Sequence, residues 1–215
     1  MSTCGMPART ATSYAILGLL SVRDWTTYEL AKQVQRSLNW FWPRAERKLY
    51  DEPKNLVAEE WATARKAFTG QRPRTVYQIT DAGREALKAW LDEPSAPRTT
   101  EFEAMLKVFF ADAGTLDQLT GTIDAIETDT TQRLRELRDM AAQAAAGDTA
   151  FPQRQHISAL ALRLQYLQEA AVLKWTRWAR EQTAGWRSSA DPGNWDARVA
   201  LVELSADAQE QIAGE

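Results

Sequence analysis

Five cationic side chains stand at spacings that suit contact with a polyanion. Arg44, Arg47 and Lys48 lie three and four residues apart, so they share one face if this segment is a helix. Arg72 and Arg74 form a second cluster around a proline. A guanidinium group can bond two acceptors of guanine, whereas an ammonium group more often anchors phosphate. The simpler interpretation of each cluster taken alone is a solvated charged face. Whether the clusters contact a polyanion therefore depends on the secondary-structure elements that carry them.

Residues for metal or covalent chemistry are scarce in the sequence. His156 is the only histidine and Cys4 the only cysteine, so neither a His/Cys metal site nor a Cys–His nucleophile is expected. Glycine-rich nucleotide-binding motifs are absent from the sequence. Neighbouring carboxylates such as Asp51 and Glu52 are more typical of solvated charge than of acid–base catalysis. We therefore expect no enzyme, no cofactor and a His156 that is exposed or caps the start of a helix.

The charge distribution divides the chain into two parts. Residues 12–91 carry a net charge of +4, and residues 92–215 carry −8, although the whole chain has only −3. A polyanion partner for the first part would explain this asymmetry, and an uneven scatter of solvated charge is the alternative. Because no run of ~18 apolar residues and no signal-peptide pattern occurs, we expect a cytoplasmic protein.

The first ninety residues have the pattern of three helices followed by a β-hairpin. A buried helix starts near Thr12, a second starts at the capping box Thr26–Glu29, and a third starts at Pro43. Pro53 is expected to kink or restart the third helix, because proline removes a backbone hydrogen bond. The predicted hairpin consists of strands Trp61–Phe68 and Val76–Ile79 with a tip at Gly70–Arg74, and a helix from Ala82 to Leu91 follows Thr80.

This order of elements is that of a winged helix-turn-helix, and the segment Thr12–Leu91 resembles the PadR family of transcriptional regulators. The residues that carry the resemblance are Ala15–Leu20, Tyr28–Ala31, Phe41–Pro43, Leu49–Tyr50, Val76–Gly83 and Trp90–Leu91. The resemblance implies a mainly α fold with a small β-hairpin, in which residues 12–92 form the DNA-binding domain. Trp61 departs from the family, whose members often have a small residue before the wing.

The resemblance places the cationic clusters where a winged helix meets double-stranded DNA. The third helix would meet base edges and phosphates, and the wing arginines would suit a narrow minor groove. The start of the second helix would bind phosphate with its positive dipole end. A tyrosine of the third helix has packing as its alternative role. The predicted DNA-binding residues are Thr27, Tyr28, Arg44, Arg47, Lys48, Tyr50, Arg72 and Arg74.

Beyond a linker at Glu93–Pro97, the pattern predicts long helices. Capping boxes at Thr100 and Thr115 open two of them, and the second reaches about Ala146. A last helix runs from about Phe151 to Glu181, with apolar residues on adjacent faces. The resemblance implies that residues 98–182 form a helical dimerisation and effector domain. Residues 183–215 are a tail with a possible short helix and no predicted role.

Aromatic residues of the second part are candidates for an effector site. PadR relatives sense small, often aromatic or hydrophobic compounds, so Phe109, Trp175 and Trp178 are predicted effector contacts, with core or interface packing as the alternative. Lys174 or Arg177 would select an acidic substituent on the ring. The sequence thus predicts a homodimeric, ligand-responsive repressor that holds two recognition helices about 34 Å apart. The alternative is a winged-helix protein–protein adaptor that does not bind DNA; an enzyme is a distant third.

Overall fold

A computed structural model describes residues 10–38, 46–70 and 72–214 of the chain. The chain divides after Arg98 into two compact units. Within the described ranges, no helix has the length and apolar character needed to cross a membrane.

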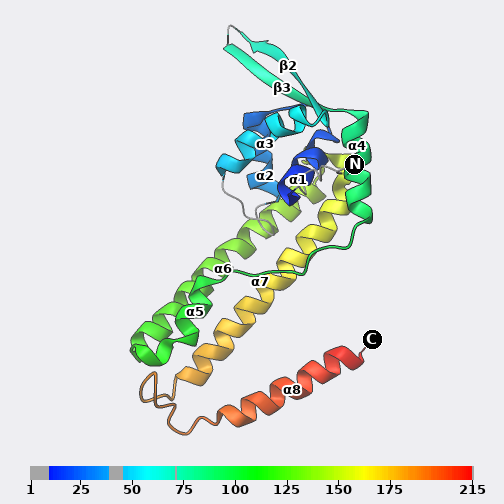
Figure 1. Cartoon of the computed structure of the whole chain (residues 1–215). Helices are drawn as coiled ribbons and strands as arrows, with labels where there is room; N and C mark the ends of the chain where they lie inside the picture. Colours follow the sequence, from blue (N-terminus) through cyan, green and yellow to red (C-terminus); the bar gives the residue numbers. More distant parts are fainter. Residues whose placement is uncertain (1–9, 39–45, 71, 215) are drawn as a thin grey trace, which may run out of the picture. The chain divides into compact units, whose positions relative to one another are not determined.

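The N-terminal unit combines short helices with a small antiparallel sheet (Figure 1). The strands lie in the order β1-β3-β2, and β2 and β3 form a long hairpin. The predicted mainly helical fold with a small β-hairpin is therefore confirmed. In chain order the elements are α1 (Ala11–Leu20), β1 (Trp25–Thr26), α2 (Thr27–Ser37), α3 (Glu46–Ala58), β2 (Ala62–Thr69), β3 (Arg72–Ile79) and α4 (Asp81–Asp92).

The core of this unit is built around α1, whose apolar side chains are buried on several faces. The capping box predicted at the start of α2 is present: the Glu29 N–H donates to Thr26 Oγ1, and the Thr26 N–H donates to Glu29 Oε2 at 2.8 Å. The Trp25 indole N–H donates to the Leu19 carbonyl at 2.7 Å, which ties β1 to α1. Other buried members of the core are Ile16, Leu17, Leu20, Leu30, Val34, Leu49, Leu56, Val76, Tyr77 and Ile79.

Of the two alternatives predicted at Pro53, a kink or a restart, the restart is wrong, because α3 runs through this proline as one helix. Leu49 and Leu56, on either side of Pro53, are 1% and 0% exposed. The two leucines stand seven residues apart and therefore lie on one helix face. Their burial against the core holds the helix on both sides of the missing backbone hydrogen bond. Local sequence patterns contain no information on this tertiary packing.

The hairpin is tighter than its predicted tip of Gly70–Arg74. Strand β3 already begins at Arg72, so Pro73 lies opposite Phe68 and Arg74 lies opposite Ala67. A proline is tolerated here because β1 pairs only with Val76 and Tyr77, which leaves β3 an unpaired edge beside Pro73. Gly70 has φ +60°, the left-handed conformation that a short hairpin turn needs.

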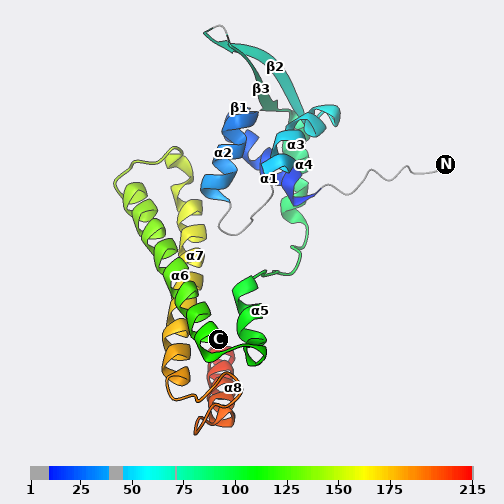
Figure 2. The same cartoon turned by 90° about the vertical axis from the view of Figure 1, so that its left-hand side faces the viewer.

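The C-terminal unit is dominated by two long antiparallel helices, which lie side by side in both views (Figures 1 and 2). Leu119, Ile123 and Ile126 are buried in this unit, and interhelical ion pairs join Arg180 to Asp124 and Glu127. Its elements are α5 (Glu103–Phe109), the 3₁₀ turn η1 (Ala111–Ala113), α6 (Leu116–Ala145), the 3₁₀ turn η2 (Pro152–Arg154), α7 (Gln155–Thr183) and α8 (Ala197–Ala213).

One of the two capping boxes predicted for this unit is present and the other is not. Thr115 and Gln118 cap α6 reciprocally, as predicted. Helix α5 instead begins at Glu103, with Phe102 at its cap position and no side-chain cap bond. The cap predicted at Thr100 is wrong because the residues before Glu103 are non-helical and exposed, so no packing holds Thr100 at the helix end.

Candidate DNA-binding surface and effector site

The start of α2 presents one exposed aromatic hydroxyl. Tyr28 is 66% exposed, whereas Thr27 is half-buried. Burial alone would raise the pKa of the Glu29 carboxyl, but hydrogen bonds from Thr26 and the nearby Arg23 lower this pKa below its ordinary value. The ionised Glu29 side chain therefore already occupies part of the positive end of α2. We expect any phosphate contact here to come from the Tyr28 hydroxyl.

Four of the predicted DNA-binding side chains lie outside the part of the chain that the structure describes. Arg44 lies outside the described residues, and so do the side chains of Arg47, Lys48 and Arg72. The backbone places Arg47 and Lys48 in the first turn of α3 and Arg72 at the start of β3. Tyr50, also on α3, is half-buried, which agrees with a packing role as well as with a contact role.

The wing carries more positive charge than the sequence analysis assigned to it. Arg65 and Lys66 on β2 are exposed, as is the predicted Arg74 on β3. Arg65 is ion-paired with Asp24 at 3.2 Å, whereas Lys66 and Arg74 have no acidic partner among the residues that the structure describes. Strand alternation puts Arg65 and Arg74 on one face and Lys66 on the other. Two consecutive cations in a predicted wing strand were the signal that could have identified them.

The three predicted effector residues line one cavity of about 470 Å³ inside the C-terminal unit. Phe109 comes from α5, and Trp175 and Trp178 come from α7. The cavity wall also includes Met105, Val108, Ala111, Asp112, Leu119, Ile123, Ala179, Gln182, Thr183, Trp186, Ser189 and Trp195.

The segment after α7 supplies two further tryptophans, which the sequence analysis missed. The rings of Trp186 and Trp195 have centroids 5.4 Å apart, and the Trp195 indole N–H donates to Gln182 Oε1 at 2.7 Å. Ser189 Oγ donates to the Gly114 carbonyl at 2.7 Å, which ties the segment to the turn before α6. This segment has no helical hydrophobic periodicity. Its high tryptophan content was the sequence signal that could have indicated a part in the effector site.

The cations predicted to select an acidic effector do not line this cavity. Lys174 and Arg177 are exposed, and neither belongs to its wall. The helical period turns position 177 away from the side on which 175, 178 and 182 lie, whereas position 174 stands one turn before 178, at the border of that side. Asp112 is instead the charged residue of the wall. The predicted selectivity for an acidic substituent is therefore not supported by this site.

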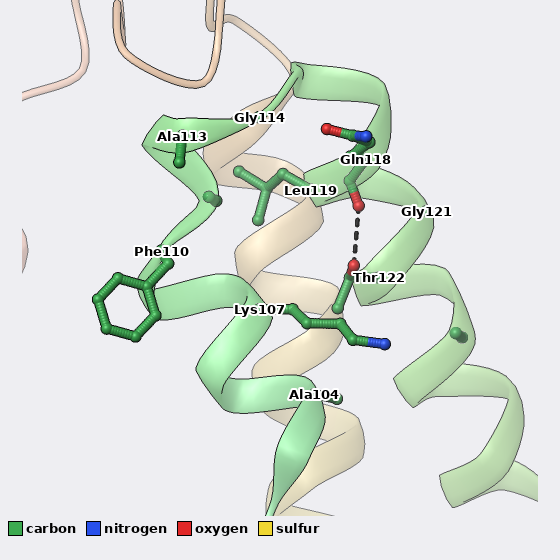
Figure 3. Close-up of a pocket in the computed structure, with 11 residues that line it drawn as sticks. Ala104, Lys107, Phe110, Ala113, Gly114, Gln118, Leu119, Gly121 and Thr122 are labelled. Atoms are coloured by element: carbon green, nitrogen blue, oxygen red, sulfur yellow. Dashed lines mark hydrogen bonds between the residues drawn. The ribbon is translucent and has the colours of Figure 1, made fainter.

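A second hollow of about 570 Å³ lies between α5 and α6 (Figure 3). Its wall consists largely of small residues, with Phe110, which is 61% exposed. Lys107 also lines it, and its ammonium group is ion-paired with Glu103 at 3.3 Å. Thr122 Oγ1 donates to the Gln118 carbonyl at 2.8 Å. With Lys107 ion-paired, Thr122 bonded to the backbone and only one ring in its wall, this hollow is a weaker ligand site than the tryptophan-lined cavity.

Comparison with known proteins assigns both units to described families. The transcriptional regulator PadR-like family matches residues 16–89, and the virulence activator alpha C-terminal family matches residues 102–183. The negative transcriptional regulator PadR of Bacillus subtilis (strain 168) is 33% identical over 99 residues, which cover 45% of this chain and 54% of that protein. The chain spans about half the length of the curated relatives it matches.

Solved structures share the fold over most of the chain. The crystal structure of Bacillus subtilis PadR with operator DNA has a TM-score of 0.72 and 24% identity, covering 81% of this chain and 97% of that one. The same protein with p-coumaric acid has a TM-score of 0.63 and 23% identity, covering 79% and 96%. Neither family match includes residues 184–215. The N-terminal unit therefore contains a PadR-like winged-helix domain, and the chain shares the fold of these solved PadR structures over most of its length.

Proposed function

We propose that this protein is a homodimeric, DNA-binding transcriptional repressor whose affinity for its operator responds to a small molecule. The observation that carries the proposal is the exposed basic wing in a unit that belongs to a family of transcriptional regulators. Lys66 and Arg74 are exposed without acidic partners in the described part of the chain, so their charge is available to phosphate. The structure of the relative with operator DNA supports this use of the fold.

Dimerisation is supported by apolar side chains that the single chain leaves uncovered. Ile157, Leu160, Leu164 and Leu167 follow one another on α7 at spacings of three and four residues, and their exposed fractions are 49%, 72%, 51% and 50%. This stripe lies on a different face from the buried Gln165 and Thr176. A continuous apolar stripe in water favours association, and we propose a second copy of the chain as its partner.

The cavity that brings together Phe109, Trp175 and Trp178 is our proposed effector site. A complex of the relative PadR with p-coumaric acid supports a small-molecule effector in this fold. The effector would lower operator affinity by favouring a dimer geometry in which the two DNA-binding units no longer match the half-sites.

Salt-dependent binding to DNA upstream of the protein's own gene tests this function. Fluorescence anisotropy at several salt concentrations should show affinity that falls steeply as salt rises, by about 0.9 logarithmic units per phosphate contact. Arg74→Ala and Lys66→Ala should each reduce this slope by about 1. Lys88→Ala, which removes an exposed cation from α4, is the matched control and should leave the slope unchanged.

The competing adaptor function predicts a different result. Binding that is absent across upstream and randomised DNA, or that is unchanged in both wing variants, would replace the repressor proposal with the adaptor.

A further inference from the structure

We propose that the cavity of the C-terminal unit binds a planar organic cation, and that the segment 184–196 is part of this site. The inference rests on the proposed function, because it names the class of effector for the same cavity. It also adds Asp112, Trp186 and Trp195 to the site, of which the last two lie outside both family matches.

The wall is rich in the side chains that attract cations to their faces. Four tryptophans and Phe109 line about 470 Å³, a volume suited to a drug-sized ligand. Trp178 and Phe109 are 42% and 77% exposed, so a ligand can reach their rings from solvent. Tryptophan is the strongest partner for a cation over its ring, and its flat face also stacks on planar ligands.

The charge of the wall has the sign that a cation requires. Asp112 is the only charged residue among those that line the cavity. Its carboxylate is exposed and has no ion-pair or hydrogen-bond partner among the described residues. A carboxylate ligand would meet this negative charge with no compensating cation in the wall itself, to which neither Lys174 nor Arg177 belongs.

The hydroxyl groups of the wall and the Trp195 indole N–H already donate hydrogen bonds within the protein. Ser189 Oγ donates to Gly114, and Thr183 Oγ1 donates to the Ala179 carbonyl at 2.9 Å. Trp195 Nε1 donates to Gln182. Trp186 Nε1 has no acceptor among the described residues but is shielded from solvent, so it offers an anion no accessible bond. The cavity therefore provides ring faces, the Asp112 carboxylate and, as a neutral donor, the Gln182 side-chain amide.

The segment 184–196 is a built wall with its own internal bonds. The Arg187 N–H donates to the Asp191 carbonyl at 2.9 Å, and the Gly193 N–H donates to the Asp191 side chain at 2.9 Å. Gly193 has φ +63°, which glycine adopts without strain. Together with the bond from Ser189 to Gly114, these contacts hold Trp186 and Trp195 against the end of α7.

Calorimetric titration of the full chain with three bicyclic compounds of similar shape tests the charge preference. These are 1-methylquinolinium, which is cationic, quinoline, which is neutral at pH 7.5, and naphthalene-2-carboxylate, which is anionic. We expect the cation to bind at least about tenfold more tightly than the anion, from its attraction to indole faces and to a carboxylate. Asp112→Asn should weaken cation binding about threefold to tenfold and leave quinoline binding unchanged.

Matched variants separate the site from general effects. Asp117→Asn removes an exposed carboxylate that does not line the cavity and should leave all three affinities unchanged. Trp178→Leu should weaken quinoline and the cation by about fivefold or more, from loss of one ring face, with thermal unfolding as the check that the variant folds.

The outcomes distinguish this inference from the proposed function. The cation site is overturned if the anion binds as tightly as the cation, if Asp112→Asn has no effect, or if none of the compounds binds a preparation that still binds operator DNA. If the cation binds as expected but no DNA fragment is bound, the repressor function is wrong and the cation site stands.

Discussion

Gly83, at the start of α4, lies so close to the residues before the wing that a side chain has no room there. A Cβ atom at this position would lie 2.1 Å from the Trp61 carbonyl oxygen and 2.9 Å from Ile79 Cγ1. The Thr80 side chain and backbone hold this approach, donating to the Glu60 carbonyl at 2.7 Å and the Trp61 carbonyl at 3.1 Å. The glycine thus sets how closely α4 can pack against the wing.

Gly83→Ala is expected to lower the free energy of unfolding by about 1–3 kcal/mol, because the backbone carbonyl it meets cannot move aside easily. The control is Gly18→Ala in α1, where nothing lies within 4 Å of the new methyl group. That change should instead stabilise the protein by about 0.5–1 kcal/mol, from improved helix propensity. Urea unfolding followed by circular dichroism measures both, and equal effects would contradict the close approach.

Glu29 makes the stability of α2 depend on pH. Its carboxyl has a lowered pKa in the folded protein, so the folded state favours the ionised form. This stabilisation is complete above the pKa of an unfolded glutamate, about 4.3, and is lost as the pH falls through the lower folded value. Glu29→Gln keeps an oxygen acceptor for the Thr26 N–H but removes the charge.

We therefore expect the stability difference between wild type and Glu29→Gln to be larger at pH 7 than at about pH 3. Urea unfolding at the two pH values provides the measurement. A difference that does not change with pH would show that the capping geometry alone, without the charge, accounts for the contribution of Glu29.

At the scale of elements, α7 has two distinct faces. One face packs against α6, where Arg133 and Glu169 form an interhelical ion pair at 3.4 Å. The other carries the exposed stripe Ile157, Leu160, Leu164 and Leu167. A helix that is apolar on one solvent-facing side needs a partner, which is why we assign this face to the second copy.

Replacing two leucines of the stripe tests this assignment. The double variant Leu160→Glu/Leu164→Glu should sediment as a folded monomer of about 24.2 kDa, whereas wild type should sediment at twice this mass. Charge on the stripe would have to be buried without a partner, which is costly.

Leu201→Glu in α8 is the matched control, since Leu201 is 62% exposed and the chemical change is the same. Dissociation by the α8 variant instead of the α7 variant would move the interface to α8.

At the scale of the whole molecule, the two units are joined by an exposed stretch. The residues from Glu93 to Phe102 contain no helix or strand and are exposed, and the chain divides within them at Arg98. Dimerisation through one unit would raise the effective concentration of the other unit at the second half-site. Operator affinity then depends on both units of both copies.

A full operator should be bound about 10²–10⁴-fold more tightly than a single half-site, because the second contact is intramolecular. The double variant Leu160→Glu/Leu164→Glu should lose this advantage and bind both DNAs alike. Anisotropy with the two DNA lengths measures the ratio, and a monomeric variant that retained the advantage would show that DNA itself brings two copies together.

Local signals in the sequence predicted the parts of the fold that depend on near neighbours. The caps at Thr26 and Thr115 and the break near Gly147, which has φ +84°, each involve residues within a few positions of one another. Family resemblance then predicted the winged helix. For the DNA-binding residues, the exposure of Tyr28 and Arg74 agrees with the prediction. The roles of all the predicted DNA-binding residues remain predictions.

Tertiary contacts decided what local spacing could not. Burial of Leu49 and Leu56 keeps α3 continuous through Pro53, and strand pairing moves Arg74 from the hairpin tip into β3. The cavity joins Phe109 to Trp175 and Trp178, which are more than sixty positions further along the chain, and its charged residue is Asp112 in place of the expected cations. Side chains that are far apart in the sequence meet only when helices pack. The sequence alone therefore determined which aromatic and charged residues the chain offers for a site, and the packing determined which of them line it and what charge it carries.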